Sequence, residues 1–157
     1  MNVIFRQATS EDALIIAQMV LKLTDEICEI TKIQHFNIDL NETKQQCETL
    51  LSRGFYSAIL GFEGNTAICV VTLAQTHALY AGGKVGLIQE FYVSPEHRST
   101  GVGSKLVEQV RKHGLQQNWA CIELCTPPLP EFKRALEFYQ KNGLKPVGGR
   151  KMRQSLK

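Results

Sequence analysis

The chain has 157 residues, of which 43% are hydrophobic, and its formal net charge is +3. This length suffices for one buried core and is too short for two ordinary domains, so residues 1–157 are expected to form a single domain. The most apolar run, Ala67–Ala74, is far shorter than the ~20 residues of a membrane span, and the N-terminus lacks the pattern of a signal peptide. We therefore expect a cytoplasmic protein without membrane contacts.

Hydrophobic periodicity and turn residues predict the elements of the first half of the chain. Thr9, with Asp12 three residues later, forms a variant of the capping box that marks a helix start. The predicted elements are a strand at Asn2–Gln7, a helix after Thr9 with apolar positions to about Leu23, a helix at Leu40–Ser52, and a hairpin of Tyr56–Phe62 and Thr66–Gln75.

The second half alternates strands with helices, which predicts a mixed sheet with helices packed on it, of the α/β (α+β) class. Prolines and glycines delimit its elements. These are a strand at Val85–Val93, a helix from the glycine-rich stretch Arg98–Gly103 to about Gln117, a strand at Ala120–Thr126, a helix at Glu131–Asn142, and short strands near Leu144–Val147 and Lys151–Leu156.

The segment between the third strand and its helix carries the clearest chemical signal. Gly101 and Gly103 remove side chains from the first helical turn, so an anion can reach free backbone N–H groups at the positive end of the helix dipole. A Walker A loop is excluded because the order is Gly103-Ser104-Lys105 and the early glycine is missing. A dinucleotide fingerprint is disfavoured because Leu106 stands where its third glycine is required.

The pattern Arg98-x-x-Gly101-x-Gly103 after a strand ending in Tyr92-Val93 resembles the acetyl-CoA signature of the GCN5-related N-acetyltransferase (GNAT) family. The segment Ala135–Leu144, with Phe138-Tyr139 and Gly143, is similar to the family's second conserved block. This resemblance covers essentially the whole chain. It implies a GNAT fold: a central, mixed, mostly antiparallel twisted sheet flanked by about four helices. It also implies acetyl-CoA as acyl-donor cosubstrate and an amine as acceptor.

Carried over residue by residue, the resemblance implies a cofactor site with two parts. The backbone of one strand segment pairs with the pantetheine arm as an added strand would. The residues are Phe91, Tyr92 and Val93 for pantetheine, and Arg98, Ser99, Thr100, Gly101, Val102, Gly103 and Ser104 for the pyrophosphate. Phe132 stands where the family often has an asparagine, which puts one polar contact to the cofactor in doubt.

Two side chains are the expected catalytic residues. Glu90 is an acid on an otherwise apolar strand and is assigned as base or amine anchor, with Ile88 and Tyr92 expected on the same face by alternation. A structural role for Glu90 stays open, and Glu123 on the neighbouring strand is interpreted as structural. The resemblance places Tyr139 beside the CoA sulfur as the acid, with an ordinary core role as the alternative.

The remaining charged and sulfur-containing residues are assigned no catalytic role. The five cysteines lack paired CxxC spacing and are interpreted as free buried thiols, so no metal is expected. His97 is interpreted as a solvated loop residue. Two charged groups remain ambiguous between ligand attraction and solvated surface: Asp25, Glu26 and Glu29, which could attract a cationic amine, and the basic C-terminal residues Arg150, Lys151, Arg153 and Lys157, which could favour a phosphate-rich ligand.

The expected reaction is direct attack of an amine on acetyl-CoA in a ternary complex. The alternative is a catalytically silent acyl-CoA-binding or regulatory module of the same fold. No nucleic-acid partner is expected, because the basic residues are not interleaved with an aromatic stacking pattern. The acceptor, small molecule or protein, is left open by the sequence, and so is the choice between monomer and homodimer.

Overall fold

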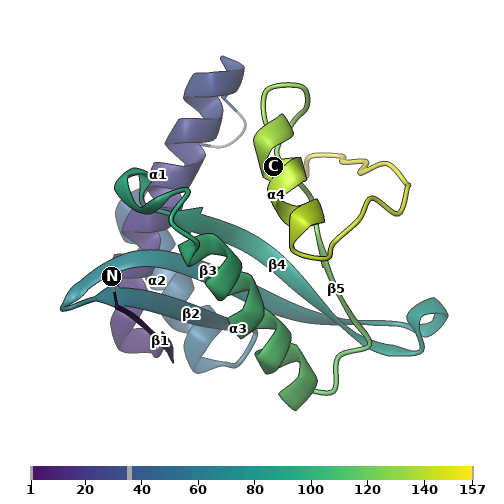
Figure 1. The fold of residues 1–157 in the computed structure, drawn as a ribbon, viewed down its shortest axis with the longest axis horizontal. Coiled ribbons are helices and arrows are strands. Elements are labelled where there is room, and N and C mark those ends of the chain that lie inside the picture. Colours follow the sequence, from purple (N-terminus) through teal and green to yellow (C-terminus); the bar gives the residue numbers. More distant parts are fainter. Residues whose placement is uncertain (1, 35–36, 157) are drawn as a thin grey trace.

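The computed structural model describes residues 2–34 and 37–156, and Lys157 is outside that range. Figure 1 labels the helices and strands, and η denotes a short 3-10 turn. The elements are β1 (Val3–Gln7), η1 (Ser10–Asp12), α1 (Ala13–Thr31), α2 (Leu40–Ser52), β2 (Tyr56–Glu63), β3 (Thr66–Ala78), η2 (Leu79–Ala81), β4 (Gly83–Val93), η3 (Pro95–His97), α3 (Val102–Gln116), β5 (Cys121–Leu124) and α4 (Lys133–Lys141).

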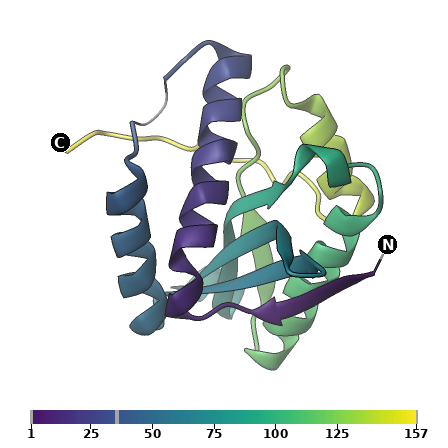
Figure 2. The same cartoon turned by 90° about the vertical axis from the view of Figure 1, so that its left-hand side faces the viewer.

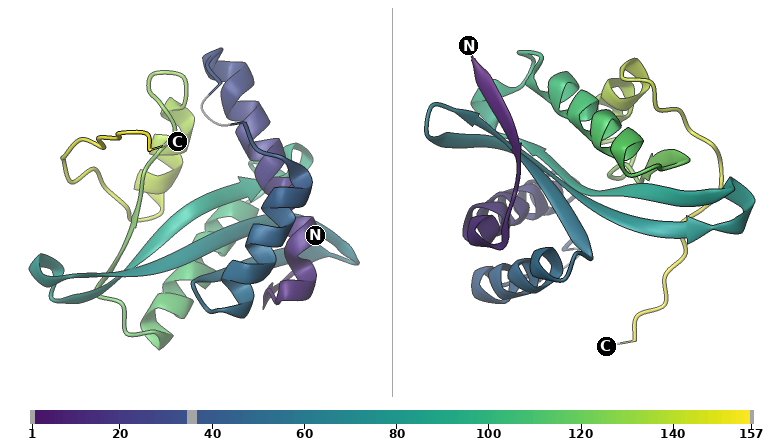
Figure 3. Two further views of the ribbon diagram at one scale, coloured as in Figure 1. Left: turned by 180° about the vertical axis from the view of Figure 1, so that it is seen from behind. Right: turned by 90° about the horizontal axis from the view of Figure 1, so that it is seen from below.

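Five strands form one sheet in the order β1-β2-β3-β4-β5. Neighbours pair antiparallel except β4 and β5, which pair parallel. Helices α1 and α2 lie side by side on one face of the sheet (Figure 2), while α3 and α4 lie on the other (Figure 3). The expected fold class, a mixed and mostly antiparallel sheet flanked by four helices, is confirmed.

Each face of the sheet has its own hydrophobic core. Toward α3 the core includes Ile88 and Val71, and toward α1 and α2 it includes Ile16, Leu60 and Tyr92. Because side chains alternate along a strand, the continuous apolar run of β3 supplies both cores at once. This is why Ile68 to Leu73 is buried throughout.

The predicted start of the first helix is confirmed. The Thr9 N–H donates to Asp12 Oδ2 at 2.8 Å, and Arg6 donates two hydrogen bonds to the same carboxylate at 2.8 and 2.9 Å. The Arg6 hydrogen bond is the main reason that the pKa of Asp12 is lowered. The helix continues beyond the predicted apolar stretch, to Thr31. Among the described residues, no helix is both long and apolar enough to cross a bilayer.

Two features of the C-terminal region differ from expectation. Helix α4 begins at Lys133 and ends at Lys141, slightly inside the predicted range. The two strands predicted near Leu144–Val147 and Lys151–Leu156 are wrong, because residues 144–156 form no regular structure. Val147, Met152 and Leu156 are exposed, so alternation buries no face. Pro146 lacks an N–H donor, and Gly148 and Gly149 have φ of 87° and 81°, which interrupts an extended path.

Candidate active site

The sheet opens at one point along β4, and this opening defines the candidate site. Within the described residues, β5 pairs with β4 only from Val85 to Ile88. Beyond Ile88 the two strands separate, and Pro127 and Pro128 follow the end of β5. In the described part of the chain, the β5-facing edge of β4 therefore has no strand partner from Gln89 to Val93, and the Val93 carbonyl accepts a hydrogen bond from Arg98 Nε. The predicted pantetheine segment, Phe91 to Val93, lies on this open edge.

A bulge in β4 decides which way its side chains point. Thr72 of β3 is opposite Glu90, but Leu73 is opposite Ile88, so Gln89 is an extra residue without a β3 partner in this register. The bulge reverses the alternation, because Ile88 belongs to the α3-side core while Tyr92 belongs to the α1-side core. Glu90 shares its face with Tyr92, and the prediction that it also shares a face with Ile88 is wrong.

Glu90 lines a small cavity of about 90 Å³ on the α1 and α2 side of the sheet. Thr72 Oγ1 donates to Glu90 Oε2 at 2.6 Å and accepts a hydrogen bond from the Glu90 N–H at 3.0 Å. Burial raises the pKa of the Glu90 carboxyl, and the Thr72 hydrogen bond partly offsets the rise. Cys47 lines the same cavity, and burial raises the pKa of its thiol to about 11, so it is a neutral group near pH 7.

Tyr139 lines a large cavity of about 380 Å³ between α1, the open part of β4, the end of β5 and α4. Its ring packs edge-on against Phe91 at a centroid distance of 5.7 Å and against Phe138 at 5.2 Å. Burial raises the pKa of the Tyr139 hydroxyl above its ordinary value, so the group is protonated at neutral pH. Within residues 2–34 and 37–156 the Tyr139 hydroxyl has no hydrogen-bond partner. Every fully buried side-chain oxygen or nitrogen in those residues does have a partner, so the Tyr139 oxygen is not fully buried and is accessible to the cavity.

Glu90 and Tyr139 therefore lie in different cavities, on the two sides of β4 where the sheet opens. The sequence did not separate them, because the bulge that does so arises from pairing with β3. Gln89, Lys151 and Arg153 line the large cavity together with Tyr139. The exposed Cys125 also lines it, so the expectation that all five thiols are buried is wrong.

The glycine turn, Arg98–Ser104, connects β4 to α3. Gly101 caps α3 with φ of 90° and ψ of −4°, a left-handed conformation that favours glycine. Gly103 brings the helix close to α4, because a Cβ there would lie 3.0 Å from the Phe138 ring. The first turn of α3 thus presents backbone N–H groups without side chains over them, an arrangement suited to an anion.

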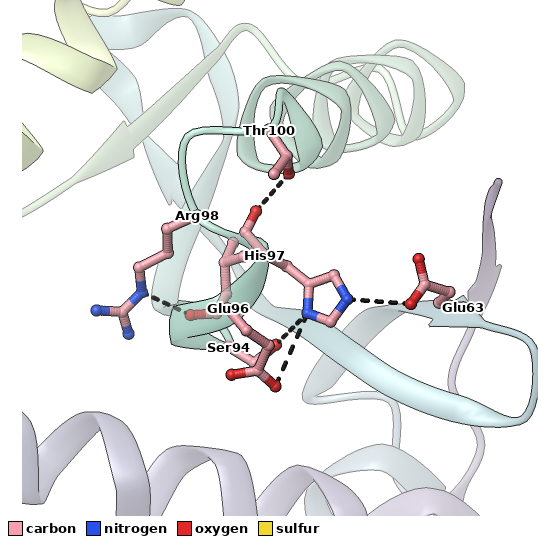
Figure 4. A network of polar contacts seen from close by, with 7 residues as sticks. Glu63, Ser94, Glu96, His97, Arg98 and Thr100 are labelled. Carbon is pink, nitrogen blue, oxygen red and sulfur yellow. Dashed lines mark hydrogen bonds and ion pairs between the residues drawn. The ribbon is translucent and has the colours of Figure 1, made fainter. Parts of the chain in front are cut away.

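A network of polar side chains orders the chain before these glycines (Figure 4). The His97 ring lies 2.9 Å from Ser94 Oγ through Nδ1 and 3.2 Å from Glu63 Oε1 through Nε2. The Thr100 hydroxyl donates to the His97 carbonyl. The His97 side chain is only 15% exposed, so its interpretation as a solvated loop residue is wrong. No local pattern predicts the contact with Glu63, because Glu63 is the last residue of β2 and is 34 residues away from His97.

The Arg98 guanidinium is held by groups of the protein itself. It donates to both carboxylate oxygens of Glu26 on α1, at 2.7 and 2.8 Å, and through Nε to the Val93 carbonyl at 2.8 Å. It also lies over the Tyr92 ring, 5.6 Å from the centroid. Glu26 is therefore paired within the site, whereas Asp25 and Glu29 are exposed.

Over the described ranges, 2–34 and 37–156, no group of three or more His, Cys, Asp or Glu side chains is placed to hold a metal ion.

Comparison with known proteins agrees with this geometry. A family model, the acetyltransferase (GNAT) domain, matches residues 54–146, more than half of the chain. Thialysine N-epsilon-acetyltransferase of Bos taurus is 27% identical over 131 residues, covering 79% of this chain and 75% of the relative.

Solved structures show the same fold at low sequence identity. A possible acetyltransferase from Clostridium difficile 630 has a TM-score of 0.81 at 14% identity, covering 99% of both chains. A predicted acetyltransferase with acetyl-CoA from Clostridium acetobutylicum has a TM-score of 0.80 at 17% identity, covering 98% of this chain and 96% of the other.

The chain belongs to the GNAT acetyltransferase family. Within that family its class is that of the acetyl-CoA-dependent N-acetyltransferases. The resemblance found in Arg98–Gly103 and Ala135–Leu144 is thereby confirmed at the level of the family.

Proposed function

We propose that this enzyme transfers the acetyl group of acetyl-CoA to a primary amine by direct attack in a ternary complex. The neutral amine adds to the thioester carbonyl, and the tetrahedral intermediate collapses with loss of the CoA thiolate. The amine loses a proton and the thiolate gains one, so the products are an amide and free CoA. No covalent enzyme intermediate is needed, and the buried Cys47 thiol, with its raised pKa, is not required.

The cofactor is proposed to bind along the open edge of β4 and over the glycine turn. The edge from Phe91 to Val93 supports pairing with the pantetheine amides, because β5 has already separated there. The left-handed Gly101 cap and the bare first turn of α3 support pyrophosphate binding by backbone N–H groups. The open edge beside the large cavity is the observation that carries the proposal. The edge offers backbone groups that can pair with the pantetheine amides, and the adjacent cavity has room for the thioester and the amine.

The two catalytic groups are proposed to act on opposite sides of the thioester. Tyr139, protonated because burial raises its pKa, would donate a proton to the departing sulfur. Glu90, whose pKa is raised by burial, would act on the acceptor side as base or amine anchor. A base with a raised pKa accepts a proton more readily, which suits removal of a proton from an alkylammonium or from the attacking amine.

The acceptor can be identified by measuring free-thiol release from acetyl-CoA across a panel of amines. Thialysine is the first to test, because a relative is named for that activity. Lysine, polyamines, aminoglycosides and peptides with free N-termini complete the panel. Release of thiol matched by acetylated amine in mass spectrometry would support the proposal. CoA binding without acetylation of any member would favour the silent acyl-CoA-binding module.

The cofactor site has a separate test in Gly101→Val. A side chain at this φ costs about 1–3 kcal/mol of backbone strain or shifts the turn, so CoA affinity is expected to fall roughly ten-fold or more in calorimetry. Gly64→Val is the matched control, because Gly64 has φ of 60° and open space around it but lies in the β2–β3 turn. Equal CoA affinity in wild type and Gly101→Val would contradict the assignment.

A further inference from the structure

The ion pair between Glu26 and Arg98 joins two parts of the chain that are 72 residues apart. Both oxygens of the carboxylate accept, and both terminal nitrogens of the guanidinium donate, so the pair is bidentate. The side chains are 31% and 39% exposed, which leaves the pair partly screened by solvent. The resemblance to the family gave Glu26 no role in cofactor binding.

This ion pair fixes three structural elements relative to one another. Arg98 is the first residue of the glycine turn, and its Nε bonds the carbonyl of Val93 at the end of β4. Glu26 is on α1, and the neighbouring α1 residues Thr24 and Ile27 line the large cavity. The turn, the end of the open strand edge and one wall of the cavity are therefore connected through a single guanidinium.

We propose that Glu26 is a positioning residue for cofactor binding, which acts through Arg98 to hold the backbone amides of the glycine turn in their binding orientation. Arg98 then serves the pyrophosphate indirectly, because three of its N–H donors are directed at Glu26 and Val93. The proposal rests on the proposed function only in taking CoA as the ligand. It does not depend on the identity of the amine or on turnover.

Two possible roles of Arg98 predict opposite changes in CoA affinity when the charge of Glu26 is removed. If Arg98 is a direct ligand of the pyrophosphate, Glu26 competes with the phosphates for the guanidinium and repels them, so removing its charge tightens CoA binding. If Glu26 positions the turn through Arg98, removing its charge loosens the turn and weakens binding. The sign of the change in CoA affinity therefore separates the two roles.

The test is a double-mutant cycle on the full chain. Calorimetry measures the CoA affinity of wild type, Glu26→Gln, Arg98→Gln and the double variant. We expect Glu26→Gln and Arg98→Gln each to weaken binding by roughly 3- to 30-fold, a range reduced for the partial exposure of the pair. The double variant should match the single variants, since each change removes the same interaction. Glu29→Gln is the matched control, because Glu29 is an exposed carboxylate on α1 three residues after Glu26, and the CoA affinity of this variant should stay within about two-fold of wild type.

Kinetics and thermal melting separate positioning from simple stabilisation. With any amine that is acetylated, Glu26→Gln should raise the KM for acetyl-CoA while kcat at saturation is retained. A lower melting temperature with unchanged CoA affinity of the folded variant would overturn the proposal, and so would unchanged or tighter CoA binding. If no amine of the panel is acetylated but Glu26→Gln still weakens CoA binding, only the proposed function is overturned. A wild-type chain that binds no CoA would overturn both.

Discussion

The two halves of β4 have the same neighbour on one side and different surroundings on the other. From Val85 to Ile88 the strand pairs with β3 and with β5, and Gly86 lies against the Trp119 ring. From Glu90 to Val93 it pairs with β3 alone. In the first half both edges of the strand are paired, while the second half has one free edge and contains the polar side chain of Glu90. One strand thus has a fully paired half and a half with an accessible backbone, because β5 ends its pairing with β4 at Ile88.

The bulge at Gln89 marks the boundary between these halves. The bulge interrupts the hydrogen-bond ladder between β3 and β4, since Gln89 has no partner on β3 in the described register. It turns Glu90 toward α1 and α2 and leaves Phe91 on the side of Tyr139. Of the two proposed catalytic residues, Glu90 lies on the open half and Tyr139 of α4 packs against Phe91 of that half, whereas mutations in the paired half should change stability.

The largest expected effect is that of Glu90→Gln. Turnover should fall by roughly 10²- to 10⁴-fold, because the amide is isosteric and cannot accept the proton. In wild type, kcat/KM should fall as pH drops through the raised pKa of Glu90, at a pH above the ordinary glutamate range, because the base must be ionised. This limb should disappear in the variant, while CoA affinity is retained.

Glu123→Gln is the control for Glu90, since it removes a carboxylate from β5 in the paired region opposite Leu87. Its rate should stay close to wild type. Melting curves for Glu90→Gln check the fold. A half-buried carboxyl with a raised pKa destabilises the folded state as pH rises, so the variant should melt no lower than wild type at alkaline pH. Unchanged rates at all pH values would leave Glu90 a structural residue.

Tyr139→Phe should lower kcat by roughly 10- to 10³-fold, with little change in CoA affinity or melting temperature. A thiol with a pKa of about 8.5 can leave in part as thiolate, so the hydroxyl helps without being indispensable. The substitution keeps the ring packing against Phe91 and Phe138 and removes only the donor. Full turnover in Tyr139→Phe, combined with unfolding in Tyr139→Ala, would assign the residue to the core.

Gly86→Ala tests the paired half. A Cβ there would lie 2.0 Å from Trp119 Cε3, so the indole must move. We expect a loss of roughly 1–3 kcal/mol in the free energy of unfolding and a fall in melting temperature of about 2–4 °C for each kcal/mol. The rate per folded molecule should be retained. Adding Trp119→Phe should relieve part of the loss, so an additive double variant or a large drop in kcat would break the contrast between the halves.

Thr72→Val should give the smallest effect and tests how Glu90 is held. The change removes the hydroxyl that donates to Glu90 Oε2, and because that bond lowers the pKa, the pH–rate limb should move to higher pH. Above the limb, kcat should fall by about 2- to 10-fold. Thr72→Ser keeps the donor and is the control. A pH profile identical to wild type in Thr72→Val would show that the hydrogen bond does not tune Glu90.

The sequence by itself determined the parts that depend on short stretches of chain. The glycines of Arg98–Ser104, the capping box at Thr9, helix α2 and the β2–β3 hairpin were all predictable, because conformational freedom, caps and alternation act over a few neighbouring residues. Motif spacing was enough to predict the family. The predicted C-terminal strands show the limit of such signals, because alternation indicates a strand only where one face becomes buried.

The tertiary structure alone decided where the functional side chains point. The face on which Glu90 lies depends on an extra residue in the pairing with β3, and its hydrogen bond to Thr72 spans 18 residues. The pairing of Arg98 with Glu26 spans 72 residues and has no local pattern. The open edge exists because β5 leaves β4 after Ile88. Each of these depends on contacts between distant segments, which form only when the chain packs.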